Sequence, residues 1–317
     1  MTEAKFITAA DALSDWRDDL LSGTPPTLYP IGEGELSRIQ VGPGLITLIG
    51  GAPGAGKSAF AMQAVFDALR LTPTLRAVVC SVEMPPAVLL ERQFARLSGV
   101  DLATIRSRKL GQEHAGRVDA TMATMEEIAE RLAFVRPPFD LGNVAATADA
   151  FDAGLILLDY IQRIPPPGKH ADKRGAIDEA MAYLRQFADA GTAIIAVAAV
   201  SRSKDARGRS TYGEGLNLAS FRESSELEFG ADDAFILLPD AEDPGRVMLH
   251  HAKSRHGEPK DIALSFEGRL QRFTPVPSPF SGTTNKPTAG KLQNALADLW
   301  ARTRPADDDQ ADEGDEG

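Results

Sequence analysis

The stretch "GAPGAGKS" at 51–58 follows the apolar run "LITLIG" and precedes the helical pattern "SAFAMQAVFDALR". It satisfies the pattern G-x-x-x-x-G-K-S/T in the strand, loop and helix context that a phosphate-binding loop requires. Its glycines let backbone N–H groups converge on an anion at a helix N-terminus. The stretch predicts binding of ATP with Mg²⁺, with Lys57 at the β and γ phosphates and Ser58 at the metal. The other predicted nucleotide contacts are Gly51, Ala52, Pro53, Gly54, Ala55 and Gly56.

Outside this loop, short apolar runs alternate with helical stretches. Nearly continuous apolar runs of this kind are typical of parallel strands that are covered on both faces. The last two runs follow each other without a helix, which indicates an antiparallel edge. The sequence therefore predicts an α/β fold with a mainly parallel sheet sandwiched by helices. The runs lie at 77–84, 132–136, 154–160, 193–200, 233–239, 246–254 and 261–268.

Two carboxylates follow predicted strands near the phosphate loop. Asp159 ends "GLILLDY", and the carboxyl ends of parallel strands line the ligand crevice, so Asp159 is expected to help hold Mg²⁺. Glu83 ends the run "AVVCSVEM" and is followed by two prolines. In that crevice it could orient and polarise the water that attacks ATP. The simpler alternative for both is an ordinary strand-end acid that reaches water.

The chain of 317 residues has room for one large domain with attachments. Ala9, Leu13, Trp16 and Leu20 form one apolar stripe on an N-terminal helix, which could pack on its own domain or dock on a neighbouring copy. A second short helix is expected at 289–303. The predicted organisation is an N-terminal helix and linker at 1–29, an ATPase domain at 30–274, a Pro/Ser linker with a short helix at 275–305 and an acidic disordered tail at 306–317.

Composition excludes several classes of protein. The sequence has no run of eighteen apolar residues, and its N-terminus carries acidic residues where a signal peptide would be apolar. A cytoplasmic protein without membrane contact is therefore expected. A single cysteine, Cys80, excludes an internal disulfide and a multi-cysteine metal site. Seven acids in the tail account for most of the net charge of −11. A nucleic-acid role must therefore depend on local basic loops.

Several blocks in order resemble the RecA-like motor domain of the DnaB-type replicative helicases. They are "GGAPGAGKS", "SVEMPPAVLLERQFARLSGVDLATIRSRKL", "ILLDYIQRI", "SFRESSELEFGADDAFIL", "HHAKSRHGEP" and "LSFEGRLQRF". The resemblance runs from about Pro30 to Phe273 and implies a ring of subunits, usually six. It also implies ATP hydrolysis between neighbours and single-stranded DNA in the central channel.

The resemblance also assigns roles to residues. Glu83 matches the water-activating glutamate, and Asp159 matches the second acid of the magnesium site. Arg255 in "KSRHG" matches the arginine finger that reaches the neighbour's γ-phosphate, with Lys253 on the same strand face. An arginine suits that task because its charge is permanent and its fork grips two phosphate oxygens. Without the resemblance, Arg255 would be interpreted as an exposed hairpin base.

Two basic loops follow strands at the crevice side. One spans 165–175 and carries Lys169, Lys173 and Arg174. The other spans 201–215 and is rich in glycine, which suits contact with a phosphate backbone irrespective of base sequence. Its basic residues are Arg202, Lys204, Arg207 and Arg209. The alternative is that both are solvated surface loops.

The chain also departs from the family pattern. Where the family carries a glutamine that senses the γ-phosphate, the aligned residue is Ala199, and Gln162 belongs to another position. Only some 40 residues precede the core, so a separate N-terminal collar domain is not expected. These departures favour an ATPase of a phage or plasmid, or an accessory ATPase, over the replicative helicase of the host. They leave two hypotheses: a DNA-stimulated helicase or translocase, with a possible loader or primase as partner, and a slow RecA-like ATPase switch that binds DNA or a protein.

Overall fold

The computed structural model describes residues 6–168, 172–200, 203–204, 210–211, 216–221, 225–243 and 245–277. The chain divides into two compact units, Met1–Val276 and Pro277–Gly317. The helix expected at 289–303 and the acidic tail lie outside the described residues.

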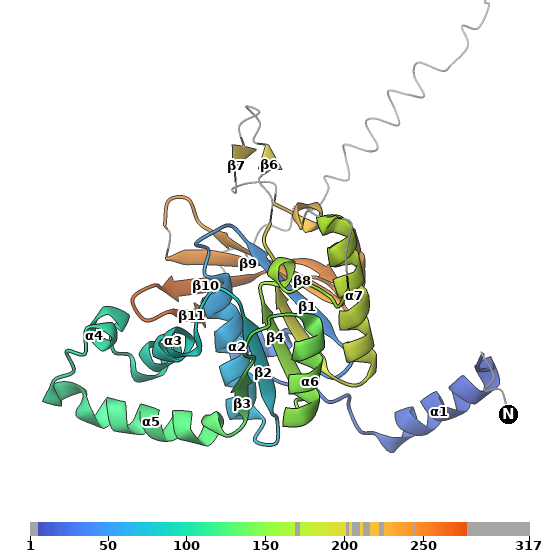
Figure 1. The fold of residues 1–317 in the computed structure, drawn as a ribbon, viewed down its shortest axis with the longest axis horizontal. Helices are drawn as coiled ribbons and strands as arrows, with labels where there is room; N and C mark the ends of the chain where they lie inside the picture. Colours follow the sequence, from blue (N-terminus) through green and yellow to red (C-terminus); the bar gives the residue numbers. More distant parts are fainter. Residues whose placement is uncertain are drawn as a thin grey trace, which may run out of the picture. The chain divides into compact units, whose positions relative to one another are not determined.

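The centre of the first unit is a mixed sheet, and its described part has nine strands (Figure 1). Five strand pairs are parallel: β1 with β5, β1 with β8, β4 with β5, β2 with β4, and β2 with β3. The pairs from β8 to β11 are antiparallel, so the predicted mainly parallel sheet with an antiparallel edge is confirmed. In spatial order the strands are β11 (Arg272–Pro275), β10 (Ile262–Glu267), β9 (Arg246–Ser254), β8 (Asp233–Pro239), β1 (Ile46–Gly51), β5 (Ala193–Val197), β4 (Leu155–Asp159), β2 (Ala77–Ser81) and β3 (Leu132–Phe134).

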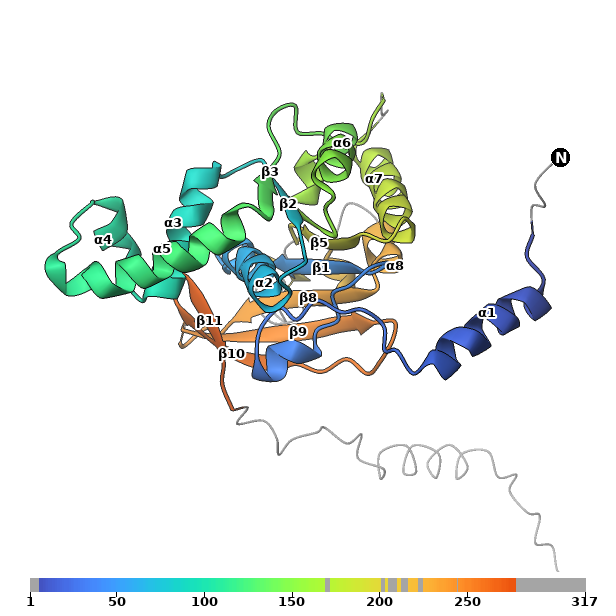
Figure 2. The ribbon, with the colours of Figure 1, turned by 90° about the horizontal axis from the view of Figure 1, so that it is seen from below.

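The central strands are buried on both faces because their side chains alternate between two apolar cores. Val79 of β2 lies in one core with Phe60 and Phe66 of α2 (Lys57–Leu71). Its neighbour Val78 lies in the other core, with Leu184 of α7 (Lys173–Asp189). The remaining helices are α3 (Pro86–Ser98), α4 (Leu102–Arg106), α5 (Ala115–Ala129), α6 (Leu141–Phe151) and α8 (Ser225–Gly230), and Figure 2 shows the sheet between its helical layers.

The short elements lie in connections. They are η1 (Gly34–Arg38), η2 (Gln112–His114), η3 (Ile161–Arg163), η4 (Leu218–Ser220), and the small antiparallel pair β6 (Ser203–Lys204) and β7 (Ser210–Thr211).

The N-terminal helix α1 (Ala9–Ser22) begins and ends with defined caps. The Thr8 hydroxyl accepts a hydrogen bond from the Asp11 N–H, and Gly23 ends the helix with a left-handed φ of 68°. Its apolar stripe is exposed: Trp16 and Leu20 each expose 58% of their surface. Among the described residues, no helix is long and apolar enough to cross a membrane.

Candidate nucleotide-binding site

The phosphate loop connects β1 to α2. Gly54 and Gly56 have φ values of 81° and 89°, which glycine adopts without strain. A Cβ at position 56 would also lie 2.7 Å from the ring of Phe273, so a larger residue would displace the loop. The Lys57 ammonium donates hydrogen bonds to the carbonyls of Gly51 and Ala52, both at 2.9 Å. Lys57 therefore lies along the loop whose N–H groups would hold phosphates.

Ser58 and Asp159 meet at the base of the site, because β4 ends two strands away from β1. The Ser58 hydroxyl donates to Asp159 Oδ1 at 3.1 Å. Burial raises the pKa of the Asp159 carboxyl above its usual value, and the hydrogen bond from Ser58 opposes that shift. Burial likewise lowers the pKa of Lys57, against the attraction of Asp159 and Glu83. The base of the site thus holds a carboxyl group and an ammonium group in a poorly solvated place.

The oxygen donors of Ser58 and Asp159 are of the type that Mg²⁺ prefers. Within the described residues, no group of three or more His, Cys, Asp or Glu side chains could hold a metal ion. The pair fits Mg²⁺ that takes most of its other ligands from phosphates and water, as is usual for nucleotide sites.

Glu83 lies two residues beyond the end of β2, on the same rim as Lys57. Its carboxylate is 52% exposed, and Oε1 lies 3.7 Å from Arg163 Nη1 of η3. The described residues form a cavity of about 540 Å³ at this place. Lys57, Ser58, Asp159 and Glu83 all line this cavity, which we call the nucleotide cavity. Three strand ends that are distant in sequence therefore contribute to one site.

Three further residues line the nucleotide cavity although the sequence analysis assigned them no role: Arg92, Phe266 and Gln271. Burial and then Arg106 lower the pKa of Arg92, and attraction to Asp159 opposes this. Phe266 stacks on Phe273 with ring centroids 4.3 Å apart. The Phe266 ring offers an aromatic surface on which a nucleobase could stack. In the sequence, Arg92 resembles any basic residue on a helix face and Phe266 any core aromatic. The available signal was their place in two of the family blocks, the one that begins "SVEMPP" for Arg92 and "LSFEGRLQRF" for Phe266 and Gln271.

Arg255 and Lys253 do not line the nucleotide cavity of their own chain. The Lys253 ammonium donates to the carbonyls of Glu228 and Ala231, both at 2.7 Å, at the C-terminal end of α8. Arg255 Nη1 donates to Asp232 Oδ1 at 2.7 Å, and Nη2 donates to the Phe229 carbonyl at 2.9 Å. The side chains of Lys253 and Arg255 are therefore both hydrogen-bonded to the C-terminal end of α8 and the residues that follow it.

The predicted DNA contacts fall largely outside the described part of the chain. Lys169, Arg202, Arg207 and Arg209 are not described, and Lys204 is described only as backbone in β6. The DNA-contact hypothesis therefore stays a prediction.

A profile of the DnaB-like helicase C-terminal domain matches residues 39–275. Among curated proteins, the replicative DNA helicase DnaB of Pasteurella multocida is 27% identical over 244 residues, covering 73% of this chain and 51% of that protein. The replicative DNA helicase DnaC of Bacillus subtilis is 23% identical over 261 residues, covering 78% and 56% respectively. The chain thus spans about half the length of these relatives.

Two solved structures share the fold. One is an ATPase domain that superposes with a TM-score of 0.73 at 20% identity, covering 86% of this chain and 100% of that one. The other is a DnaB-like replicative helicase, solved in a study of its interactions with primase. It superposes with a TM-score of 0.72 at 20% identity, covering 87% of this chain and 69% of that one. The expected RecA-like architecture is confirmed.

Proposed function

Because the chain belongs to the DnaB-like helicase C-terminal domain family, we propose that it is an ATP-hydrolysing, ring-forming helicase or translocase that acts on single-stranded DNA. The observation that carries this proposal is the assembly of Lys57, Ser58, Asp159 and Glu83 around one cavity. These are the side chains that phosphate binding, metal binding and water activation require, and they come from three separate strand ends.

In the proposed mechanism, the Lys57 ammonium leaves the loop carbonyls and binds the β and γ phosphates. Ser58 and Asp159 would hold Mg²⁺, which when bound neutralises charge that develops on the phosphates. Glu83 orients the attacking water, and its exposed carboxylate leaves room for that water. Arg255 of a neighbouring copy completes the site by binding the γ-phosphate, since it lies outside the nucleotide cavity of its own chain.

The domain organisation and assembly are part of the proposal. Residues 30–274 form the ATPase domain, and the exposed stripe of α1 docks on a neighbouring copy in a ring, with six subunits expected. Single-stranded DNA contacts the basic loop at 201–215. A cytoplasmic location, a role in phage or plasmid replication and a loader or primase partner also remain proposals.

One observation favours the alternative, a slow ATPase switch. Ala199 lines the nucleotide cavity, and its methyl group cannot donate a hydrogen bond to a γ-phosphate. If no other group links the phosphate to the DNA loop, then ATP would control assembly without driving movement along DNA.

Steady-state ATP hydrolysis with and without single-stranded DNA separates these functions, with Glu83→Gln as the blank. Stimulation by DNA supports the translocating ring. Hydrolysis that depends on Glu83 but ignores DNA supports the switch. No hydrolysis above the blank at protein concentrations where rings form would contradict both.

A further inference from the structure

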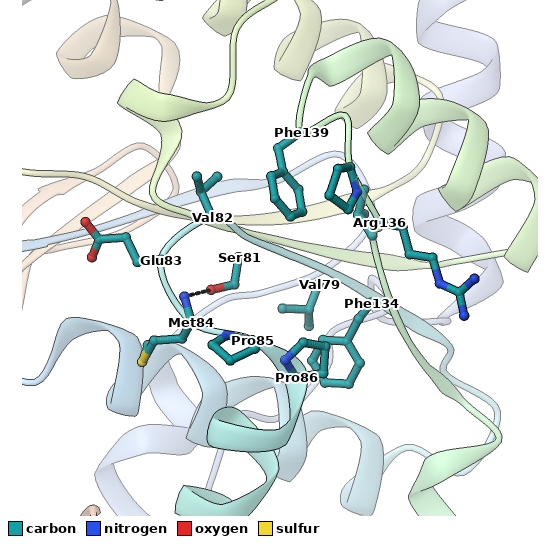
Figure 3. A pocket seen from close by; sticks show the side chains of 12 residues that line it. Val79, Ser81, Val82, Glu83, Met84, Pro85, Pro86, Phe134, Arg136 and Phe139 are labelled. Carbon is teal, nitrogen blue, oxygen red and sulfur yellow. Dashed lines mark hydrogen bonds between the residues drawn. The ribbon is translucent and has the colours of Figure 1, made fainter.

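A second cavity, of about 700 Å³, lies beside the nucleotide cavity (Figure 3). Glu83 and Met84 line both cavities. The walls of the second cavity are mainly apolar, and Figure 3 shows Phe139 facing Pro85 and Pro86 across it. Glu83 and Arg136 stand at opposite ends. The remaining lining residues are Val79, Ser81, Val82, Phe134, Val135 and Pro137.

The chemistry of ATP hydrolysis does not account for this cavity. No residue of the phosphate loop lines it, and neither Ser58 nor Asp159 does. An open apolar hollow with charges only at its rim is typical of a place that receives an apolar group.

Phe229, the penultimate residue of α8, is 67% exposed. Among the described residues beyond α1, it is the one aromatic in the set of large exposed apolar side chains. Its backbone is nevertheless well held, because its carbonyl accepts hydrogen bonds from Arg255 at 2.9 Å and Lys253 at 3.0 Å. The exposed Phe229 ring is therefore held in solvent close to the side chains of Lys253 and Arg255.

We propose that Phe229 of one copy enters the second cavity of a neighbouring copy of this chain. The inference depends on the proposed function, in which Arg255 reaches the neighbour's nucleotide cavity next to Glu83. The Phe229 carbonyl contacts the Arg255 guanidinium, so the ring arrives at the same rim. The second cavity opens there, because Glu83 belongs to both cavities.

The charges around the two surfaces are complementary. Lys253 and Arg255 both contact the carbonyl of Phe229, so two cationic groups lie beside the exposed ring. The cavity carries an acid, Glu83, at one end and a base, Arg136, at the other. In the proposed contact the two cationic groups beside Phe229 lie toward Glu83, and this attraction favours that orientation over others.

Seating the ring would have a consequence for hydrolysis. Val82 and Met84 flank Glu83 in the chain, and both line the second cavity. A ring packed against them holds the backbone of Glu83 in one position. Phe229 therefore acts as a positioning residue across the interface.

Disulfide trapping tests the contact, because the native Cys80 should not react under mild oxidation. Cys80 is buried, and burial raises the pKa of its thiol to about 12. In the variant Phe229→Cys with Phe139→Cys, mild oxidation with Mg²⁺ and a non-hydrolysable ATP analogue should join chains into a ladder of covalent multimers. The matched control pairs Phe229→Cys with Leu110→Cys, an exposed position that lines neither cavity, and should give no ladder.

A second pair distinguishes this inference from the proposed function. Arg255→Cys with Met84→Cys reports whether the bases reach the neighbour's nucleotide cavity at all. A ladder from this pair but not from Phe229 and Phe139 overturns the inference and leaves the proposed function standing. No ladder from either pair overturns both. A ladder from Trp16→Cys with Phe139→Cys, in place of Phe229, would show that the cavity seats α1.

Assembly gives an independent measurement. Phe229→Ser should raise the protein concentration needed for ring formation by roughly tenfold, whereas Phe229→Leu should raise it much less. Phe229 is exposed, so at concentrations too low for ring formation both variants should melt at the temperature of the unaltered protein. Equal assembly of the serine and leucine variants would overturn the inference.

Discussion

The side-chain amide of Gln162 forms two hydrogen bonds with the backbone of Ala199. Gln162 Nε2 donates to the Ala199 carbonyl at 3.1 Å, and the Ala199 N–H donates to Gln162 Oε1 at 3.1 Å. Gln162 lies in η3, three residues after Asp159, and Ala199 follows β5 where the chain enters the basic loop at 201–215. Ala199, which has no side-chain donor, is therefore linked through its backbone to the segment that follows Asp159 and β4.

We predict that Gln162→Leu leaves ATP hydrolysis without DNA close to normal and reduces its stimulation by single-stranded DNA by roughly tenfold. Two hydrogen bonds of about 1 kcal/mol each couple the strand ends, and leucine can make neither. The measurement is ATP turnover across a DNA titration. Gln112→Leu, at an exposed position on η2, is the control. Full stimulation in Gln162→Leu would show that coupling does not pass through this pair.

Glu83→Gln should bind ATP normally but hydrolyse it about 10² to 10⁴ times more slowly, because the amide cannot accept a proton from water. Equilibrium nucleotide binding and single-turnover hydrolysis measure the two steps separately. Glu127→Gln, an exposed position on α5, controls for loss of charge. Turnover within a few-fold of normal would remove Glu83 from the mechanism.

Arg255 is predicted to act across the interface. Arg255→Ala and Lys57→Ala should each abolish hydrolysis alone, yet a mixture should regain part of it. In mixed rings an intact Lys57 site meets an intact Arg255 of its neighbour. Asp232 keeps its partners Arg185 and the Ile46 N–H in Arg255→Ala, so the fold should persist. A mixture no more active than its components would place Arg255 outside the neighbour's site.

Loss of α1 should weaken assembly. Leu13, Trp16 and Leu20 form an exposed apolar stripe that a neighbouring copy would bury. Burial of each side chain contributes about 1.5–3 kcal/mol to the free energy of assembly. Deletion of residues 1–22 should therefore lower the mass in solution with ATP present. Replacement of these three residues by serine should do the same at unchanged length. An unchanged mass in both variants refutes docking of α1 on a neighbour.

The pair of His250 and Asp261, 2.9 Å apart, predicts a pH dependence of stability. The hydrogen bond raises the pKa of His250 above 6.5 and lowers that of Asp261 below 3.8. The histidine contribution is complete below pH 6.5 and is lost as pH rises through the raised pKa. The carboxylate contribution is present above pH 3.8 and is lost as pH falls through the lowered pKa.

Stabilisation by this pair is therefore largest between these limits. Asp261→Asn should lower Tm by roughly 1–3 °C near pH 5, a small effect because the pair is partly exposed. Near pH 8.5 the decrease in Tm should be smaller, because the histidine contribution is lost as pH rises. A difference in Tm that is equal at both pH values would show that the pair contributes no charge interaction.

The phosphate loop, the parallel strands and the α/β class could all be predicted from the amino-acid sequence. These features depend on neighbouring residues: the glycine spacing around 54 and 56 sets the loop, and the continuous apolar runs require burial on both faces. The comparisons confirm the family that the ordered blocks indicated.

Several contacts between distant residues could be known only from the folded chain. Tertiary packing places Arg92 and Phe266 in the nucleotide cavity and brings the Gln162 side chain to the backbone of Ala199. It also forms the second cavity from the ends of β2 and β3. These relationships depend on the register and packing of segments far apart in the chain, and no local pattern encodes them.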